Sequence, residues 1–189
     1  MSRLVANTSA PKLESLDFLG QPISLSAYQG RVVLLSFYRY ASCPLCNMRM
    51  AELISSHERL SDQGLSIIAV FQSPASAIAR YVGRQDAPFP IIADPEMIHY
   101  REWSVETSWS GAAKAAFARL GQVLRAFRGG YLPGAVEGPL HRMPADFLIA
   151  PSGIIDLVYY GKDVGDHVPL SLIEERLNIL NNGHLRTGA

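Results

Sequence analysis

The stretch VVLLSFYRYASCPLCNMRMAELI, residues 32–54, decides the fold expected of this chain. Its first six residues are a nearly continuous apolar run rich in Val and Leu, which is typical of a strand buried on both faces of a sheet. From Cys46 onward, apolar residues recur at helical spacing, and Pro44 stands in the first turn, where its missing N–H costs nothing. The run LSIIAVFQ at 65–72 predicts a second buried strand. Together these segments predict a right-handed strand–helix–strand crossover with parallel strands.

Shorter elements are expected around this unit. The patterns predict helices at 74–85 and 95–103, and a last helix that begins with Ser171 and ends before Gly183. They also predict a strand in FPIIAD at 89–94 and a hairpin at 145–161 that turns through Pro-Ser-Gly. We therefore expect an α/β fold in one domain over 1–189, with a central mixed sheet flanked by helices and a core at about 13–181.

A helical insertion is expected at about 104–142. Its helix would carry an apolar face and a set of basic side chains. The basic side chains are expected to form a solvated surface; the alternative is a surface that forms a homodimer with a second copy of the chain or binds another partner. The apolar face is Ala113, Phe117, Leu120, Leu124 and Phe127, and the basic set is Lys114, Arg119, Arg125 and Arg128.

Composition excludes several function classes. The chain has 189 residues, 48% of them apolar, with 17 basic and 17 acidic side chains, so neither nucleic acid nor an anionic membrane is expected as a partner. No apolar run reaches the roughly 18–20 residues of a membrane span, and the first residues lack the apolar core of a secretory signal. A cytoplasmic location is the expectation. Two cysteines cannot build a structural disulfide framework.

The two cysteines, Cys43 and Cys46, form a Cys-x-x-Cys motif where the first strand meets the helix. A thiolate at a helix N-terminus is stabilised by unpaired N–H groups and the helix dipole, which lowers its pKa. Residues at i and i+3 lie about 5–6 Å apart at Cβ, so a small adjustment allows a disulfide. We expect Cys43 to be the exposed attacking thiolate and Cys46 the buried resolving partner.

Two other interpretations of the pair stay open. Both cysteines can be packing residues, since free Cys is among the most buried residue types. A zinc site is the third interpretation, but it needs four ligands, and the sequence has neither a second Cys pair nor a His-x₃₋₅-His motif. The five histidines are scattered, and His57, on the apolar face of the helix, is expected to be a packing residue.

With these residues in place, the chain resembles the thioredoxin-like superfamily and, more narrowly, the alkyl hydroperoxide reductase/thiol-specific antioxidant (peroxiredoxin-like) family. The resemblance covers about residues 13–181 and is carried by DFLGQPISLSAYQGRVVLLSFYR, ASCPLC, MPADFLIAPSGIIDLVYYG and YYGKDVGDH. It implies a thioredoxin-like fold and an antioxidant oxidoreductase in cell redox homeostasis. No cofactor is implied.

The chain also departs from that family. The family places Pro and Thr ahead of its reactive cysteine, where this chain has Ser36 and Tyr40, and it places a catalytic arginine just before the late strand, where Pro144 stands. Since that arginine polarises the peroxide, its absence puts fast peroxide reduction in doubt. Pro144 instead matches the cis-proline that lies beside the cysteines in thioredoxins, and the resemblance implies a cis peptide bond there, against a plain trans proline at a strand start.

Several further residues are candidates for supporting roles. Arg39 or Arg49 can stabilise a thiolate or a peroxide oxygen, although a solvated charge is the default for each. Tyr40 can donate a hydrogen bond at the site or simply end the strand. Trp103 and Trp109 flank the insertion and are expected either to cover the pocket or only to pack. Asp166 and His167 are expected in a loop near the last helix, with Asp166 as a turn or cap residue.

These features predict a thiol-dependent oxidoreductase. Cys43 would attack a peroxide or a protein disulfide, Cys46 would resolve the product to a disulfide, and a thioredoxin- or glutathione-type reductant would restore the pair. The residues alone do not choose between the two substrates. The alternative is a non-enzymatic redox-sensing or partner-binding module with the same fold.

Overall fold

The computed structural model describes residues 2–110 and 119–187, and a five-stranded mixed sheet forms its centre. The strand order is β5-β4-β3-β6-β7, with β3 parallel to β4, β4 parallel to β5, and antiparallel pairing across β3–β6 and β6–β7. The strands are β3 (Val32–Phe37), β4 (Leu65–Phe71), β5 (Ile91–Ala93), β6 (Ala145–Ile149) and β7 (Ile155–Tyr160). The predicted strand–helix–strand unit and the hairpin turning through Pro-Ser-Gly are both confirmed.

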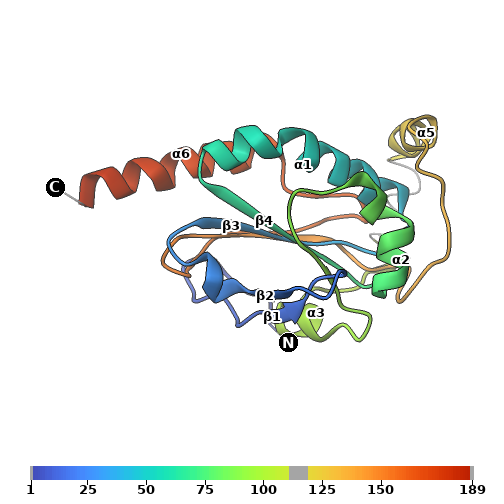
Figure 1. Ribbon diagram of the computed structural model, residues 1–189, viewed down its shortest axis with the longest axis horizontal. Coiled ribbons are helices and arrows are strands. Elements are labelled where there is room, and N and C mark those ends of the chain that lie inside the picture. Colours follow the sequence, from blue (N-terminus) through green and yellow to red (C-terminus); the bar gives the residue numbers. More distant parts are fainter. Residues whose placement is uncertain (1, 111–118, 188–189) are drawn as a thin grey trace.

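Helices cover both faces of this sheet (Figure 1). On one face lie α1 (Pro44–Asp62) and α6 (Leu170–Thr187); on the other lie α3 (Ile98–Glu102) and the small sheet of β1 (Glu14–Leu16) and β2 (Pro22–Ser24). The prediction that the last helix ends before Gly183 is wrong, because α6 continues to Thr187. A glycine inside a helix costs only about 1 kcal/mol, so it does not by itself stop one.

Each face of the sheet has its own hydrophobic core. Alternate residues of β3 point to opposite faces, as strand geometry requires. Leu34 packs with Met50 and Leu53 of α1, and Leu35 and Phe37 pack with Tyr100 and Trp103 near α3. All six residues of β3 are buried, which confirms its prediction as the central strand. The end of β3 is therefore held rigidly from both sides.

The remaining short helical segments lie before β3 and after β4 in the chain. The predicted helix at 74–85 is divided into α2 (Ala75–Arg80) and a 3-10 turn at Val82–Gln85, and a second 3-10 turn, Leu25–Tyr28, precedes β3. Among the helices of the described residues, none combines the length and the apolar character that crossing a bilayer requires.

An antiparallel bridge between Thr107 and Arg142 joins the two ends of the region of the expected insertion. Within it the structure contains α5 (Leu120–Arg128), which packs against α1 and lies at the far end of the molecule from the C-terminus (Figure 1). The described part of the predicted apolar face is largely exposed, and Ala113, Lys114 and Phe117 lie outside the described residues. A single-domain chain with an insertion at 104–142 stays a prediction.

Candidate redox site

Cys43 is the N-cap residue of α1, one turn ahead of Cys46. Between the end of β3 and the helix, the chain makes a tight turn in which the Cys43 N–H donates to the Tyr40 carbonyl at 3.0 Å. The side-chain amide of Asn47 donates to the carbonyls of Ala41 (2.7 Å) and Cys43 (2.9 Å). These bonds fix the position of Cys43 at the helix N-terminus, where backbone N–H groups are free to stabilise an anion.

The two thiols differ strongly in acidity. The pKa of Cys43 is lowered to about 6, mainly by a hydrogen bond from the Cys46 thiol; burial opposes the shift, and the Arg39 charge and the N–H groups of Cys46 and Leu45 support it. The pKa of Cys46 is raised well above its ordinary value by burial and by the hydrogen bond that the Cys46 thiol donates to Cys43. At neutral pH the pair therefore consists of a Cys43 thiolate and a Cys46 thiol.

Arg39 is the cation of the site. Its Nη1 donates to the Cys43 Sγ at 3.4 Å, its Nη2 donates to the Leu140 carbonyl, and its guanidinium lies 4.9 Å from the centre of the Tyr40 ring. The side chain is 6% exposed, so the default expectation of a solvated charge is wrong for this residue. Tyr40 is also buried and forms the aromatic surface on which the guanidinium rests.

Removing the charge of Arg39 should raise the pKa of Cys43. An opposite charge in contact typically changes a pKa by about 1–3 units, so Arg39→Met should move the Cys43 titration upward by that amount. The measurement is the ultraviolet absorbance of the thiolate during a pH titration of the reduced protein. The exposed Arg101 on α3 provides the control Arg101→Met, which should titrate like the wild type. An unchanged midpoint in Arg39→Met would refute the electrostatic role.

Cys43 is not exposed, contrary to the prediction, since both cysteines are 1% exposed. The cover is residues 131–140, called here the strap, which has no regular secondary structure. Its carbonyls accept hydrogen bonds from Ser42 (2.6 Å, at Ala135), from Arg39 and from Gln72. The strap is thus bonded to the residue before Cys43, to the cation beside it and to the end of β4. Sequence reasoning missed this cover because a Gly/Pro loop carries no periodic signal.

Loosening the strap should expose Cys43. Ser42→Ala removes the 2.6 Å hydrogen bond to the Ala135 carbonyl, and one such bond contributes about 1 kcal/mol, or roughly a fivefold change in an opening equilibrium. We expect maleimide to label Cys43 about five times faster in this variant. Ser55→Ala is the matched control, because Ser55 bonds only within α1 on an exposed surface. Equal labelling rates in the two variants would show that the strap does not limit access.

Pro144 lies immediately before β6, which pairs with the end of β3 that leads to the cysteines. Its peptide bond is trans, since the described residues contain no cis bond, and the implied cis-proline is wrong. The trans form suits a proline that starts a strand, because it is favoured by about 0.5–1 kcal/mol and the neighbouring residue, Ala145, pairs with Phe37 without distortion.

Arg49 lies away from the sulfurs, in a buried polar cluster that sequence reasoning missed. Its centre is Asp146, 1% exposed, which accepts hydrogen bonds from Ser36 Oγ (2.7 Å), Val168 N–H (2.8 Å) and His167 Nδ1 (3.1 Å). Burial would raise the pKa of Asp146, but the charge and hydrogen bond of His167 and the charge of Arg49 outweigh it, and the pKa is lowered. Arg49 also donates to the Val168 carbonyl at 2.8 Å. The cluster joins β3, β6, α1 and the segment that precedes α6.

The other candidate residues lie outside the cysteine site. Trp103 is fully buried in the core on the opposite face of the sheet, and Trp109 is 68% exposed and stacks on His141, so the expectation that they cover the pocket is not supported. Asp166 accepts bonds from the Lys162 N–H and the Tyr159 hydroxyl, as expected of a turn residue. His57 packs on Phe89. No three His, Cys, Asp or Glu side chains gather closely enough within the described ranges to hold a metal ion.

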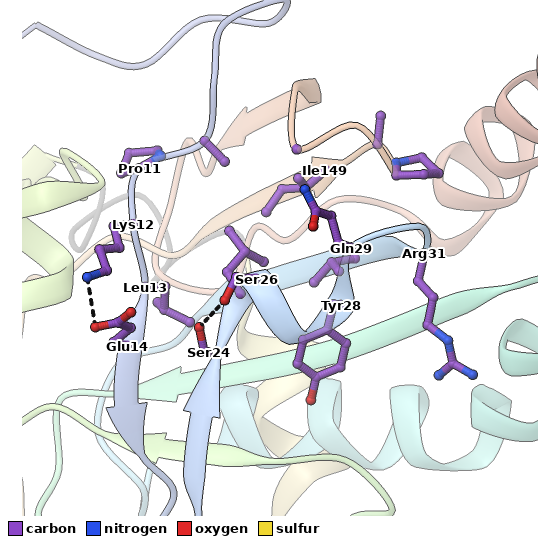
Figure 2. Close-up of a pocket in the computed structure, with 16 residues that line it drawn as sticks. Pro11, Lys12, Leu13, Glu14, Ser24, Ser26, Tyr28, Gln29, Arg31 and Ile149 are labelled. Carbon is purple, nitrogen blue, oxygen red and sulfur yellow. Dashed lines mark hydrogen bonds and ion pairs between the residues drawn. The ribbon is translucent and has the colours of Figure 1, made fainter.

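A cavity of about 220 Å³ lies at the other end of the central strand from the cysteines. Its wall includes Arg31 and Val33 at the start of β3 and the turn between β6 and β7. Figure 2 shows the Lys12–Glu14 ion pair on the same wall. Since six strand residues span about 20 Å, this cavity is well separated from Cys43, which follows the opposite end of β3. It is not part of the candidate redox site.

Known proteins resemble this chain in both sequence and fold. Peroxiredoxin Bcp of Escherichia coli is 25% identical over 96 residues, which cover 51% of this chain and 62% of that protein. The chloroplastic Peroxiredoxin Q of Sedum lineare is 21% identical over 110 residues, which cover 58% of this chain and 59% of that protein. The matched region thus spans about three fifths of each relative's own length.

Solved structures agree with this fold. The crystal structure of Peroxidoxin BcpB from Mycobacterium tuberculosis superposes with a TM-score of 0.65 at 15% identity, over 96% of this chain and 98% of that one. The thioredoxin domain of a thiol-disulfide oxidoreductase from Bacteroides vulgatus gives 0.55 at 17% identity, over 92% and 99%. These neighbours confirm the thioredoxin-like fold. The AhpC/TSA family profile matches residues 6–158, most of the chain. The chain therefore belongs to the AhpC/TSA family.

Proposed function

We propose that this protein is a thiol-dependent oxidoreductase in which Cys43 is the nucleophile and Cys46 the resolving thiol. The observation that carries the proposal is the asymmetry of the pair: the pKa of Cys43 is lowered to about 6, chiefly by a hydrogen bond from the Cys46 thiol, and Arg39 lies 3.4 Å from its sulfur. The thiolate is the reactive form of cysteine, so the pair is prepared for reaction at neutral pH.

Peroxide is the electrophile that the site favours. The Cys43 thiolate attacks one peroxide oxygen, the O–O bond breaks, and the leaving alkoxide or hydroxide takes a proton, giving a sulfenic acid. The Cys46 thiol then condenses with the sulfenic acid, releasing water and forming the Cys43–Cys46 disulfide. Arg39 supplies a positive charge beside the reacting oxygens and so takes over the electrostatic role of the family's arginine, whose position Pro144 occupies in this chain. An external dithiol of thioredoxin or glutathione type would restore both thiols.

Burial of Cys43 supports peroxide over a protein disulfide. A small peroxide can reach a sulfur that is 1% exposed with little movement of the strap, whereas a protein disulfide needs the strap displaced. The second candidate is the redox-sensing module: a strap bonded to both Ser42 and Arg39 would change its position once Cys43 is oxidised and present a different surface to a partner.

The test is stopped-flow fluorescence of the reduced protein mixed with hydrogen peroxide and, separately, with a protein disulfide. Faster reaction with peroxide than that of a free thiol, and repeated turnover with a dithiol, support the peroxidase. Disulfide exchange faster than peroxide reaction would make the protein a thioredoxin-like reductant. One oxidation without turnover favours the sensor, and no reaction with either substrate beyond that of a free thiol refutes the enzyme.

A further inference from the structure

A cavity of about 330 Å³ lies between α1, α5 and the segment that precedes α6. It borders the first two turns of α1 from Leu45 to Glu52, on a different face of the helix from Cys46. Neither cysteine lines it, so it is separate from the redox site. Its size is at the small end of ligand cavities, which suits a small molecule rather than a polypeptide.

Two buried nitrogens in the wall of this cavity lack a partner. His167 donates or accepts through Nδ1 at Asp146, but its Nε2 has no hydrogen-bond partner among the described residues, and its side chain is 5% exposed. The Nε–H of Arg49 is likewise buried and unpaired within the described ranges. More than nine in ten buried polar groups in proteins are hydrogen-bonded, so these two nitrogens are groups with which a polar ligand atom would pair.

The charges in the wall favour an anion. Three arginines, Arg49, Arg119 and Arg125, face one carboxylate, Glu52. Arg49 pairs with Glu52 at 2.6 Å, and Arg119 pairs with Asp163 and Asp166 outside the wall. Arg125 forms no ion pair within the described part of the chain. Among the described residues, one guanidinium that lines this cavity is thus left without a counter-charge.

We propose that this cavity binds a small molecule through an oxyanion, either a carboxylate or a phosphate group. Its oxygens would accept hydrogen bonds from Arg125 and from the Nε–H of Arg49, in the charge-assisted geometry that guanidinium groups form with both anions. His167, whose Nδ1 is hydrogen-bonded to Asp146, would donate to the same anion through Nε2 when that nitrogen carries a proton. The three side chains that would bind the anion, Arg49, Arg125 and His167, take no part in the redox chemistry.

The test is a titration of the isotope-labelled, reduced full-length chain, followed by amide NMR shifts, with succinate and separately with inorganic phosphate at constant ionic strength. Binding should shift amides of the wall, such as Met48 and Gly165, saturably. Arg125→Gln should weaken the affinity about tenfold or more, which corresponds to about 1.4 kcal/mol. Arg125 is exposed and on α5, so the variant should fold; Arg101→Gln, on α3, is the control and should bind like the wild type.

The outcomes separate cleanly. Saturation by succinate assigns a carboxylate ligand, and saturation by phosphate assigns a phosphate ligand. Either result supports the site if the affinity is about tenfold or more weaker in Arg125→Gln. Absence of saturation with both anions up to about 10 mM overturns the proposal. Equal affinities in Arg125→Gln and the wild type overturn it as well. Because binding is measured without any redox reaction, the result is independent of the proposed oxidoreductase activity.

Discussion

Cys43→Ser is expected to abolish oxidation of the protein by peroxide. Cys46→Ala and Cys46→Ser should still allow the first step, formation of the sulfenic acid on Cys43, and block the second, formation of the disulfide. The reason is that only a thiolate attacks peroxide at a useful rate, and the pKa of Cys46 is raised well above its ordinary value, so Cys46 stays protonated. Stopped-flow fluorescence and mass spectrometry of the product measure the two steps. Full oxidation in Cys43→Ser would assign the nucleophile to Cys46 instead.

The matched pair Cys46→Ala and Cys46→Ser separates two roles of Cys46. Serine keeps an O–H that can donate to the Cys43 sulfur, whereas alanine keeps no donor. Since that hydrogen bond is the largest cause of the lowered pKa of Cys43, alanine should raise the pKa toward the ordinary value near 8.5 and reduce the thiolate fraction at pH 7 by up to about 30-fold. A thiolate with a higher pKa is intrinsically more nucleophilic, which offsets part of the loss in reaction rate.

The effect of residue 46 on the pKa of Cys43 should also change how the rate of the first step depends on pH. In the wild type the rate of the first step should be half-maximal near pH 6, since the thiol form below the pKa does not react, and it should be nearly constant above pH 7. In Cys46→Ala the rate should still rise between pH 7 and 8, and Cys46→Ser should lie closer to the wild type. Identical profiles in the two variants would show that the hydrogen bond from residue 46 does not set the acidity of Cys43.

Asp146→Asn is expected to lower the free energy of unfolding by about 3–5 kcal/mol at neutral pH. Asp146 is the anion of a buried polar cluster, and its replacement removes the charged acceptor of the hydrogen bonds from Ser36, His167 and the Val168 N–H. The midpoint of urea unfolding measures the loss. The Lys12–Glu14 pair is largely exposed, and Glu14→Gln is the control, which should cost less than about 1 kcal/mol. A loss no larger than that of the control would contradict the role of the cluster.

The contribution of Asp146 also depends on pH. Because its folded pKa is lowered, the stabilisation is complete above the unfolded carboxyl pKa of about 3.9 and is lost as the pH falls through the folded value. The difference in stability between wild type and Asp146→Asn should therefore be constant from about pH 5 to pH 7 and narrow below pH 4. A difference that persists unchanged into acid would attribute the effect to packing rather than to charge.

Much of the fold could be predicted because it depends on local patterns. The apolar run at Val32–Phe37, the helical spacing after Cys46 and the turn at 151–153 each specify an element without reference to the rest of the chain. The position of Cys43 at the start of α1 followed from the same reasoning. The thioredoxin-like fold came from the resemblance and not from the patterns.

The site's surroundings could not be predicted, because they are formed by residues far apart in the sequence. The strap reaches Ser42 from 93 positions away, and Asp146 bonds to Ser36 across 110. No local rule indicates which loop covers a helix N-terminus. One signal was available: Gln72 and Ser73 directly follow β4, and polar residues at the carboxyl ends of adjacent parallel strands lie at one edge of a sheet. Because Cys43 follows the carboxyl end of the adjacent strand β3, Gln72 and Ser73 could have been predicted to lie near it.

If Cys43 and Cys46 form one redox pair, the product of peroxide oxidation is a disulfide between them. The reduced protein is treated with one equivalent of hydrogen peroxide, remaining thiols are alkylated, and the intact mass is measured. The wild type should lose two hydrogens and have no alkylated cysteine, whereas Cys46→Ser should gain one oxygen on Cys43. A wild-type protein that retains both thiols, or gains oxygen without forming the disulfide, would contradict this pairing.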